Sequence, residues 1–222
     1  AEAGDGRWVA GAMGPLGRMG EDVVEPAEVE GIFAEQARAL VEGGADFIML
    51  ETFASLTLLL AALRGVKGSV DVPVAAQMVF TQRGRTHSGR TARACFEALI
   101  QAGADVVGLN CGIGPKNSLE VVQELGPVAV PLSVLPNAGF PEATGDRLMY
   151  ASSPEYFARQ TAACAAHGAR LLGGCCGTAP EHIAALVRVL RAGSPVARGT
   201  AKVPEKIDAQ SAAPTRLARR LT

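Results

Sequence analysis

Short apolar runs alternate with longer segments of helical periodicity through the first 192 residues of the chain. The apolar runs predict six strands, near residues 8–13, 46–50, 73–80, 106–110, 130–136 and 171–175. The periodic segments predict six helices, over residues 27–42, 56–63, 91–102, 119–125, 154–167 and 179–192. Strands that are apolar throughout and alternate with helices are typical of a parallel sheet, because helices cover both of its faces.

A short repeat supports this alternation. Three similar segments each end a predicted helix and open the next strand: Gly44-Ala45-Asp46, Gly103-Ala104-Asp105 and Gly168-Ala169-Arg170. At the end of each of these strands, polar or thiol side chains recur at one place in the repeat: Glu51-Thr52, Asn110-Cys111 and Cys175-Cys176. The best fit is a TIM-type (β/α)8 barrel, in which alternate strands contribute to the same layer.

The six predicted units are fewer than the eight of the common barrel. Either the chain is a fragment without the first two βα units, or it is a shorter open α/β fold. The chain opens at Ala1 without an initiating Met and close to a strand, which favours the fragment. We therefore expect residues 1–192 to form an incomplete barrel of six βα units. Residues 193–222, rich in Pro, Ala, Ser, Lys and Arg, are expected to be a linker or tail.

The composition narrows the class of protein. A formal net charge of −1 gives no electrostatic reason to expect nucleic acid or an anionic membrane as partner. No apolar run reaches the roughly 18 residues of a membrane span. Five cysteines are an odd number and too few for a disulfide scaffold, so we expect a reducing cytoplasm, with thiols free or bound to metal.

Three cysteines at predicted strand ends are candidates for a metal site: Cys111, Cys175 and Cys176. Zinc prefers thiolate ligands, and a catalytic zinc uses three protein ligands and leaves one position open. Adjacent side chains of a regular strand point to opposite faces, but Gly173, Gly174 and Gly177 let the chain turn so that both neighbouring thiols reach one ion. Three thiolates make zinc a weak activator of water and a good binder of a thiol substrate. The expected chemistry is therefore attack by sulfur on carbon.

The strand-end cysteines and the glycines beside them also fit simpler roles. The cysteines are equally compatible with burial in a core, and Gly173-Gly174 with a phosphate site of the kind found in the last loops of many barrels. The last helix is expected to begin at Thr178, whose spacing to Glu181 is that of a capping box. Cys95 and Cys164 lie on apolar helical stripes and are expected to pack in the core.

Four segments together resemble the homocysteine S-methyltransferase family. They are Glu51-Thr52-Phe53, Gly108-Leu109-Asn110-Cys111, Pro136-Asn137-Ala138-Gly139 and Gly173-Gly174-Cys175-Cys176-Gly177-Thr178 with Pro180-Glu181-His182-Ile183. The resemblance implies a (β/α)8 barrel that holds catalytic zinc on Cys111, Cys175 and Cys176 and transfers a methyl group to homocysteine. Residues 10–17 further resemble bacterial bifunctional proteins in which a methylenetetrahydrofolate reductase follows this domain. Family members begin with a strand carrying Asp-Gly that helps to hold the substrate, and this strand is missing here, so the activity of this polypeptide is itself a question.

Three polar residues are candidates for binding substrate. The family uses the glutamate of the first segment to pair with the ammonium of homocysteine, which implies that role for Glu51; the alternative is a helix cap. Asn110 is expected to orient Cys111 or to bind substrate, with a turn-forming role as the alternative. The amide oxygen of Asn137 is expected to fill the open position of zinc, unless Asn137 only shapes a turn.

The leading hypothesis is a zinc-dependent methyltransferase that acts on homocysteine with a donor of the methyl-folate or S-methylmethionine type. A metal-free phosphate-binding barrel enzyme is the alternative, although no lysine ends any predicted strand. A non-catalytic barrel remnant is the third hypothesis. Residues 140–152 are long for a loop between a strand and a helix and are expected to act as a lid or a donor-binding segment.

Overall fold

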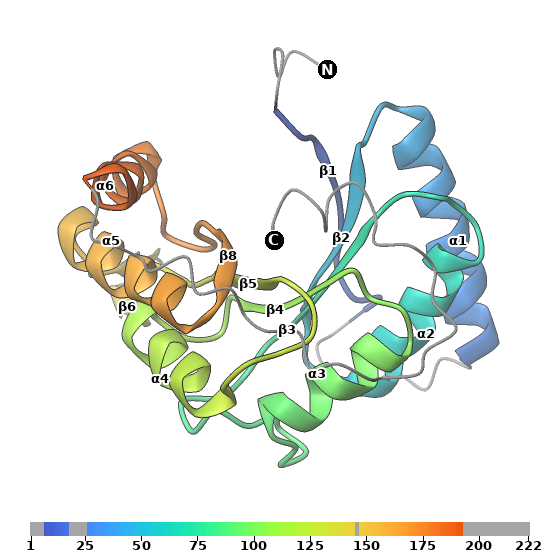
Figure 1. The fold of residues 1–222 in the computed structure, drawn as a ribbon, viewed down its shortest axis with the longest axis horizontal. Helices are drawn as coiled ribbons and strands as arrows, with labels where there is room; N and C mark the ends of the chain where they lie inside the picture. Colours follow the sequence, from blue (N-terminus) through green and yellow to red (C-terminus); the bar gives the residue numbers. More distant parts are fainter. Residues whose placement is uncertain (1–6, 18–25, 145–146, 193–222) are drawn as a thin grey trace.

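The computed structural model describes residues 7–17, 26–144 and 147–192, and its centre is one curved parallel sheet (Figure 1). The strands follow one another in the order β1 (Ala10–Met13), β2 (Phe47–Phe53), β3 (Val74–Met78), β4 (Val106–Asn110), β5 (Leu132–Leu135) and β8 (Ala169–Leu172). Every neighbouring pair among these six strands is parallel. The predicted strands are therefore confirmed, and the chain folds as an incomplete TIM-type barrel of six βα units.

The helices line the convex side of the sheet (Figure 1). They are α1 (Pro26–Glu42), α2 (Leu56–Lys67), α3 (Ala92–Gln101), α4 (Pro115–Leu125), α5 (Pro154–Ala163) with a 3-10 turn η1 (Cys164–His167), and α6 (Pro180–Arg191). Ser55, Thr91 and Ser153 begin α2, α3 and α5 with side chains that accept a backbone N–H, as capping residues do. Helix α4 starts before the predicted Leu119, because Pro115 takes a first-turn position where its missing N–H is not needed.

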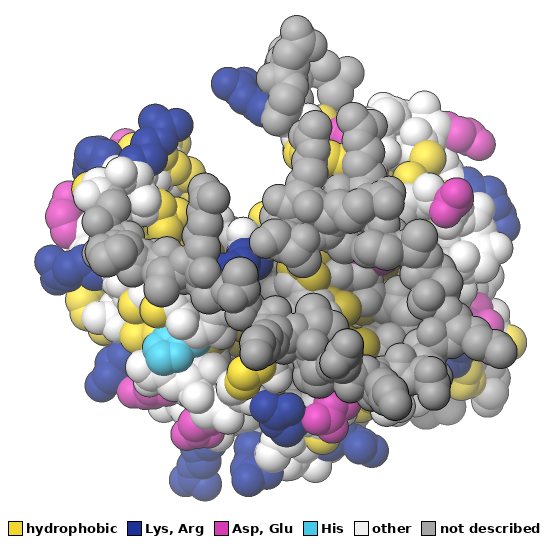
Figure 2. Space-filling model, in the orientation of Figure 1, with side chains coloured by type: hydrophobic (Ala, Val, Ile, Leu, Met, Phe, Trp, Pro, Cys, Tyr) yellow, Lys and Arg dark blue, Asp and Glu magenta, His cyan; other side chains and the backbone are white. Residues whose placement is uncertain are grey.

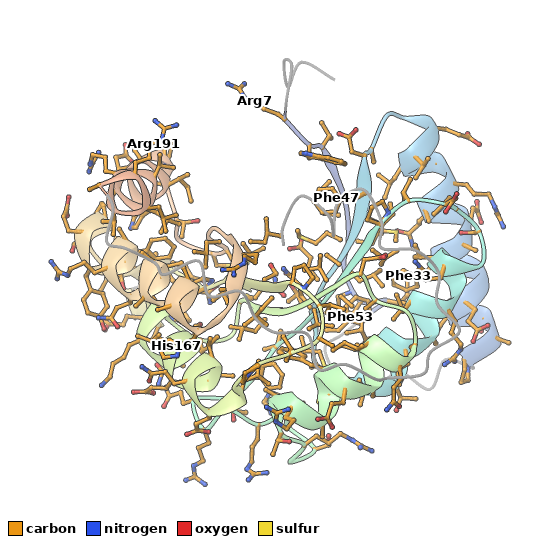
Figure 3. All side chains as sticks on the ribbon, viewed as in Figure 1. Arg7, Phe33, Phe47, Phe53, His167 and Arg191 are labelled. Atoms are coloured by element: carbon orange, nitrogen blue, oxygen red, sulfur yellow. The ribbon has the colours of Figure 1, made fainter. Side chains whose placement is uncertain are left out.

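The strands are buried on both faces, as a parallel sheet requires. Between the sheet and the helices lies the main core, in which the rings of Phe33 and Phe53 are 5.8 Å apart. On the concave face a smaller cluster contains Phe47 and Met49 of β2 with Ala75 and Val106. Figure 3 shows the labelled Phe33 and Phe53 among the helices and Phe47 toward the inside of the curve.

Residues 140–152, predicted as a long loop, contain a hairpin. Strand β6 (Pro141–Thr144) pairs with β7 (Arg147–Tyr150) in antiparallel register, apart from the main sheet. The two strands are too short to give a clear alternation of apolar and polar residues, which is why the sequence pattern missed them. The hairpin lies between β5 and α5 in the chain, and thus after a strand end that carries candidate site residues.

Charged side chains are spread over the outer helices on the face shown in Figure 2, in agreement with the near-neutral net charge. No helix within the described ranges is long and apolar enough to cross a bilayer. The predicted linker or tail over residues 193–222 lies outside the described residues.

The contact between α1 and α2 depends on a glycine and gives a first prediction. A Cβ at Gly65 of α2 would overlap the carbonyl group of Glu30, whereas a Cβ at Gly31 of α1 would meet nothing within 4 Å. Alanine has a higher helix propensity than glycine at both positions, so the two substitutions should differ only in how the added Cβ packs. We expect Gly65→Ala to lower the free energy of unfolding by about 1–3 kcal/mol. Gly31→Ala should raise it by about 0.5–1 kcal/mol. Urea unfolding of both variants measures the difference, and equal effects would contradict this account of the helix contact.

Candidate metal centre

Three of the five cysteines come together at the carboxyl ends of β4 and β8. The sulfur atoms of Cys111, Cys175 and Cys176 all lie within 4.8 Å of one another. The Cys111 and Cys176 sulfurs are 3.8 Å apart, and those of Cys175 and Cys176 are 4.0 Å apart. All three thiols are free, and their side chains range from partly buried to exposed. The sequence placed the three at one strand-end position, and the structure brings them together.

The spacing of the sulfurs fits a zinc ion. Tetrahedral zinc with Zn–S bonds of about 2.3 Å places neighbouring sulfurs about 3.8 Å apart. The observed separations of 3.8 and 4.0 Å match that value without rearrangement of the backbone. Three thiolates supply three of four ligands, which is the donor set of a site that keeps one position open. The residues present therefore fit zinc.

Three consecutive residues at the end of β5 hold the three cysteines. The N–H of Cys111 donates to the carbonyl of Leu135 at 3.1 Å, and the N–H of Cys175 donates to the carbonyl of Pro136 at 2.9 Å. The N–H of Cys176 donates to the side-chain oxygen of Asn137 at 3.1 Å. Strand β5 lies between β4 and β8 in the sheet, so one segment fixes both cysteine-bearing turns.

The turn at Cys111 has an unusual backbone. Cys111 has a φ of +54°, and Gly112 after it has a φ of +67°. A left-handed conformation is uncommon for a residue with a Cβ and is found where surrounding structure enforces it. Here the chain leaves β4, turns, and continues into α4 by way of Gly114. The turn carries the Cys111 side chain toward β8 rather than along the strand direction.

The turn at Cys175 and Cys176 ends in Gly177, whose φ of +75° reverses the chain. The carbonyl of Cys176 accepts the N–H of Ala138 at 2.9 Å, and the carbonyl of Cys175 accepts the Thr178 hydroxyl at 2.6 Å. Thr178 thus belongs to the turn, and the prediction that it begins the last helix is wrong. The helix starts at Pro180, and its first free N–H is satisfied by the ring of His182 rather than by the predicted capping box.

Hydrogen bonding between the thiols shifts the pKa values of Cys111 and Cys175 in opposite directions. A hydrogen bond from Cys175 is the largest cause of a Cys111 pKa lowered to about 5, and burial opposes this effect. The same hydrogen bond raises the pKa of Cys175 well above its usual range, with burial as the next cause. The thiolate form is therefore favoured at Cys111, and the protonated thiol at Cys175. A cation would replace the proton of the hydrogen bond between them.

Glu51, Thr52 and Asn110 form the polar neighbourhood of the cysteines. The Asn110 side chain is fully buried, accepts the N–H of Thr52 at 2.8 Å and donates to the Thr52 hydroxyl at 2.9 Å. Its amide also reaches Glu51 at 3.5 Å and the Cys175 sulfur at 3.9 Å. Thr52 has a φ of +67°, next to an irregularity in the pairing of β2 with β3. Asn110 thus links the cysteines to Glu51.

The pKa of Glu51 is raised by partial burial first and then by the negative charge of Cys111. None of the salt bridges among the described residues involves this carboxylate. A half-buried carboxylate beside a thiolate is unfavourable by itself and favours a bound positive group. The role of Glu51 in substrate binding stays a prediction, and this environment suits it.

Asn137 is buried, and its amide oxygen is engaged with the N–H of Cys176. Its side chain also contributes a hydrogen bond that stabilises the Cys111 thiolate and so lowers the pKa of that thiol. The expectation that this oxygen fills the open position of zinc stays a prediction. In this structure the side chain holds two of the three cysteines in place.

The other two cysteines lie elsewhere. Cys95 of α3 and Cys164 of η1 are fully buried, and burial raises their pKa to about 11 and about 12. Both are core residues, as the apolar helical stripes indicated. Tyr150 at the end of β7 was not singled out from the sequence, although burial and the neighbouring thiol of Cys176 raise its pKa. No local pattern identifies it, since its contact with the cysteines depends on the hairpin.

Comparisons with known proteins show the family of this chain. The family model described as homocysteine S-methyltransferase matches residues 1–190. Methionine synthases of Mycobacterium tuberculosis and Mycobacterium leprae are 35% and 34% identical over 187 residues, which is 80% of this chain. The chain spans only 16% and 15% of those two proteins.

Solved structures give the same result. The apo form of the homocysteine methyltransferase MmuM from Escherichia coli is 26% identical, with a TM-score of 0.66 over 82% of this chain and 62% of that one. Its metallated form is 25% identical, with a TM-score of 0.67 over 82% of this chain and 61% of that one.

The environment of Glu51 gives a second prediction. Because its folded-state pKa is raised, the stability that protonation provides is present at low pH and is lost as pH rises through that pKa. Glu51→Gln removes this loss, so the variant should melt higher than the parent at pH 7, by on the order of 2 °C. The difference should shrink toward pH 4, where the parent is protonated. Calorimetry at both pH values measures it, with the exposed Glu97→Gln as control. A lower melting temperature at pH 7 would mean that Glu51 already has a stabilising partner.

Proposed function

The chain belongs to the homocysteine S-methyltransferase family, and from this premise we propose that it transfers a methyl group to the thiol of homocysteine, giving methionine. The observation that carries the proposal is the cluster of three thiols within 4.8 Å beside a half-buried carboxylate. The thiols suit a metal that binds sulfur, and the carboxylate suits an ammonium group. Homocysteine carries a thiol and an ammonium on one short chain.

Zinc is the proposed cofactor, held by Cys111, Cys175 and Cys176. When bound, zinc held by three thiolates binds a substrate thiol and keeps it in the reactive thiolate form at neutral pH. The residues at the end of β5 keep the three ligands in place by accepting hydrogen bonds from the backbone N–H groups of the cysteines. The Asn110 amide, within 3.9 Å of the Cys175 sulfur, adds a donor to that thiolate.

Recognition of the amino-acid end is assigned to Glu51 and Asn110. The raised pKa of Glu51 means that its charge is poorly solvated in the free protein, so an ammonium restores a favourable interaction there. Asn110 fixes the neighbouring Thr52 and reaches the Glu51 carboxylate. The substrate would thus be held at two points, its sulfur at the cysteines and its nitrogen at Glu51, which orients the sulfur lone pair toward a donor.

The reaction is a displacement at carbon. The homocysteine sulfur forms a bond to the methyl carbon, and the bond from that carbon to the donor heteroatom breaks with its electron pair. The donor heteroatom is positively charged before the step, as a sulfonium or as a protonated methyl-folate nitrogen, so that it leaves as a neutral thioether or amine, and methionine forms as a neutral thioether. We propose a donor of the methyl-folate or S-methylmethionine type. A methyl group on positively polarised nitrogen or sulfur is the kind that a thiolate can attack.

The chain is proposed to act as one unit of a longer protein in the cytoplasm. Its match to about one sixth of two methionine synthases supports neighbouring domains. The resemblance of residues 10–17 to bifunctional proteins supports a fused reductase as one such neighbour. Free thiols at all five cysteines suit a reducing compartment.

The geometry of the glycines argues against the phosphate-binding alternative. A Cβ at Gly173 would meet the side chain of Leu135, and one at Gly174 would overlap the side chain of Thr178. These glycines therefore make room for the protein's own side chains rather than for an anion. The remaining alternative, a non-catalytic remnant, would bind neither zinc nor homocysteine, so measurements of both decide it.

The metal content tests the proposal first. Protein purified under reducing conditions should contain about one zinc per chain, because three preformed thiol ligands fit the ion. Cys111→Ser should lose most of that zinc, since a neutral hydroxyl is a far weaker ligand than a thiolate. Elemental analysis of both proteins gives the result.

Cys164→Ala is the matched control for this measurement. It removes a fully buried thiol away from the cluster, so it should keep its zinc and lose about 1–2 kcal/mol of stability. Parent protein that holds no zinc after incubation with the metal would sink the proposal.

Substrate binding gives a separate prediction. Glu51→Ala should weaken homocysteine binding about 10- to 100-fold, the range for loss of a charged hydrogen bond, while zinc content stays unchanged. Titration calorimetry of the zinc-loaded chain measures the affinity, and methionine formation is followed in parallel with each donor type. The exposed Glu97→Ala on α3 is the control and should bind as the parent does. If Glu51→Ala loses zinc, Glu51 belongs to the metal ligands instead.

A further inference from the structure

Cys176 is the most exposed of the three clustered cysteines, and its position is the hardest to explain from the main sheet alone. It follows Cys175 directly, so a regular backbone would point the two side chains apart. Its N–H is held by Asn137 and its carbonyl by Ala138, which fixes the peptide groups on either side. These bonds orient the backbone and leave the sulfur itself on the open side of the cluster.

The ring of Tyr150 covers this turn. A Cβ at Gly177 would overlap the Tyr150 ring, so the aromatic side chain lies directly on the backbone that follows Cys176. The φ of +75° at Gly177 and this overlap are two separate reasons for glycine at that position. Burial, the charge of Cys176 and a side-chain hydrogen bond with Cys176 raise the pKa of the Tyr150 hydroxyl, in that order.

The hairpin that carries Tyr150 is anchored to the same part of the molecule. Just after β7, the N–H of Ser152 donates to the carbonyl of Ala138 at 3.0 Å. The carbonyl of Ser152 lies 3.0 Å from Nε2 of the His182 ring, and Nδ1 of that ring accepts the N–H of Ala179. Because Nδ1 accepts, Nε2 carries the proton and donates to Ser152. The segment after Tyr150 is therefore tied both to the end of β5 and to the start of α6.

We propose that Tyr150 is a positioning residue of the metal centre: its ring holds the turn at Cys176 and Gly177, and its hydroxyl donates a hydrogen bond to the Cys176 sulfur. The inference rests on the proposed function, because it takes zinc to be bound by the three cysteines. Residues that orient metal ligands in this way are commonly worth 10- to 100-fold in metal affinity. A hydroxyl donor also withdraws electron density from the thiolate, which leaves the metal a stronger binder of a substrate thiol.

The test separates ring from hydroxyl. Tyr150→Phe keeps the ring and removes the donor, and Tyr150→Ala removes both. Met149→Ala is the matched control, since Met149 is exposed and precedes Tyr150 on the same strand, where successive side chains point to opposite faces. Zinc affinity of each full-length variant is measured by competition with a chelator under reducing conditions. The thiolate-to-metal charge-transfer band is recorded after loading with Co²⁺.

We expect Tyr150→Ala to bind zinc at least about tenfold more weakly than the parent, and Met149→Ala to bind it unchanged. Tyr150→Phe should retain Co²⁺ with its charge-transfer band moved to longer wavelength, because the thiolate loses its hydrogen bond. A merely structural ring would leave that band in place, so an unshifted band in Tyr150→Phe overturns the proposal. Zinc affinity of Tyr150→Ala equal to that of the parent also overturns it. Both results leave methyl transfer to homocysteine intact as the proposed function, whereas a parent protein without zinc removes both proposals.

Discussion

Three hydrogen-bond acceptors at the end of β5, two backbone carbonyls and one side-chain amide oxygen, are the constraint on which the site depends. Leu135, Pro136 and Asn137 each accept the N–H of one clustered cysteine, so a single segment sets the positions of thiols that come from two different strands. The arrangement works because β5 lies between β4 and β8 and all three strands run in parallel. Their carboxyl ends meet at one edge, and the turns that follow must bend inward. The left-handed backbone at Cys111 is a local strain that accompanies that bend.

The titratable side chains of the candidate site are acidic groups, and among the described residues no cationic side chain links them. Three thiols and one carboxylate lie together, and the link between them is a neutral amide, Asn110, rather than a lysine or arginine. A fixed cation at that position would neutralise the thiolates and compete with a metal. The amide instead orients its neighbours and leaves their negative charge available. Burial and then the negative charge of Cys111 raise the pKa of Glu51, whereas the hydrogen bond between Cys175 and Cys111 lowers the pKa of Cys111 and raises that of Cys175. This excess of negative charge supports the proposed binding of two cations, a metal at the sulfurs and an ammonium at the carboxylate.

Much of this fold and site could be predicted from the sequence, because the informative features are local. Apolar runs followed by helical periodicity identified every strand of the main sheet, and the position of Cys111, Cys175 and Cys176 at strand ends placed them at one edge. The start of α6 was misplaced because the cap is a histidine ring, a donor-acceptor pairing that the usual capping pattern does not include. Tyr150 was missed for a different reason. Its contact with Gly177 joins the hairpin to a turn that lies further along the chain, and the sequence of neither segment predicts this contact.

The two halves of the candidate site come from strands toward opposite edges of the described sheet. The hydrogen bonds that hold the N–H groups of the three cysteines come from the end of β5, which lies between β4 and β8 toward one end of the described sheet. The metal-binding half is therefore supported within this chain by strands on both sides of β5. Glu51 lies on β2 next to the edge strand β1, and Cys175 and Cys176 follow β8, the strand at the other edge of the described sheet. The proposed metal binding and substrate recognition would thus depend on different parts of the sheet, and the buried side chain of Asn110 links them because it reaches both Glu51 and Cys175.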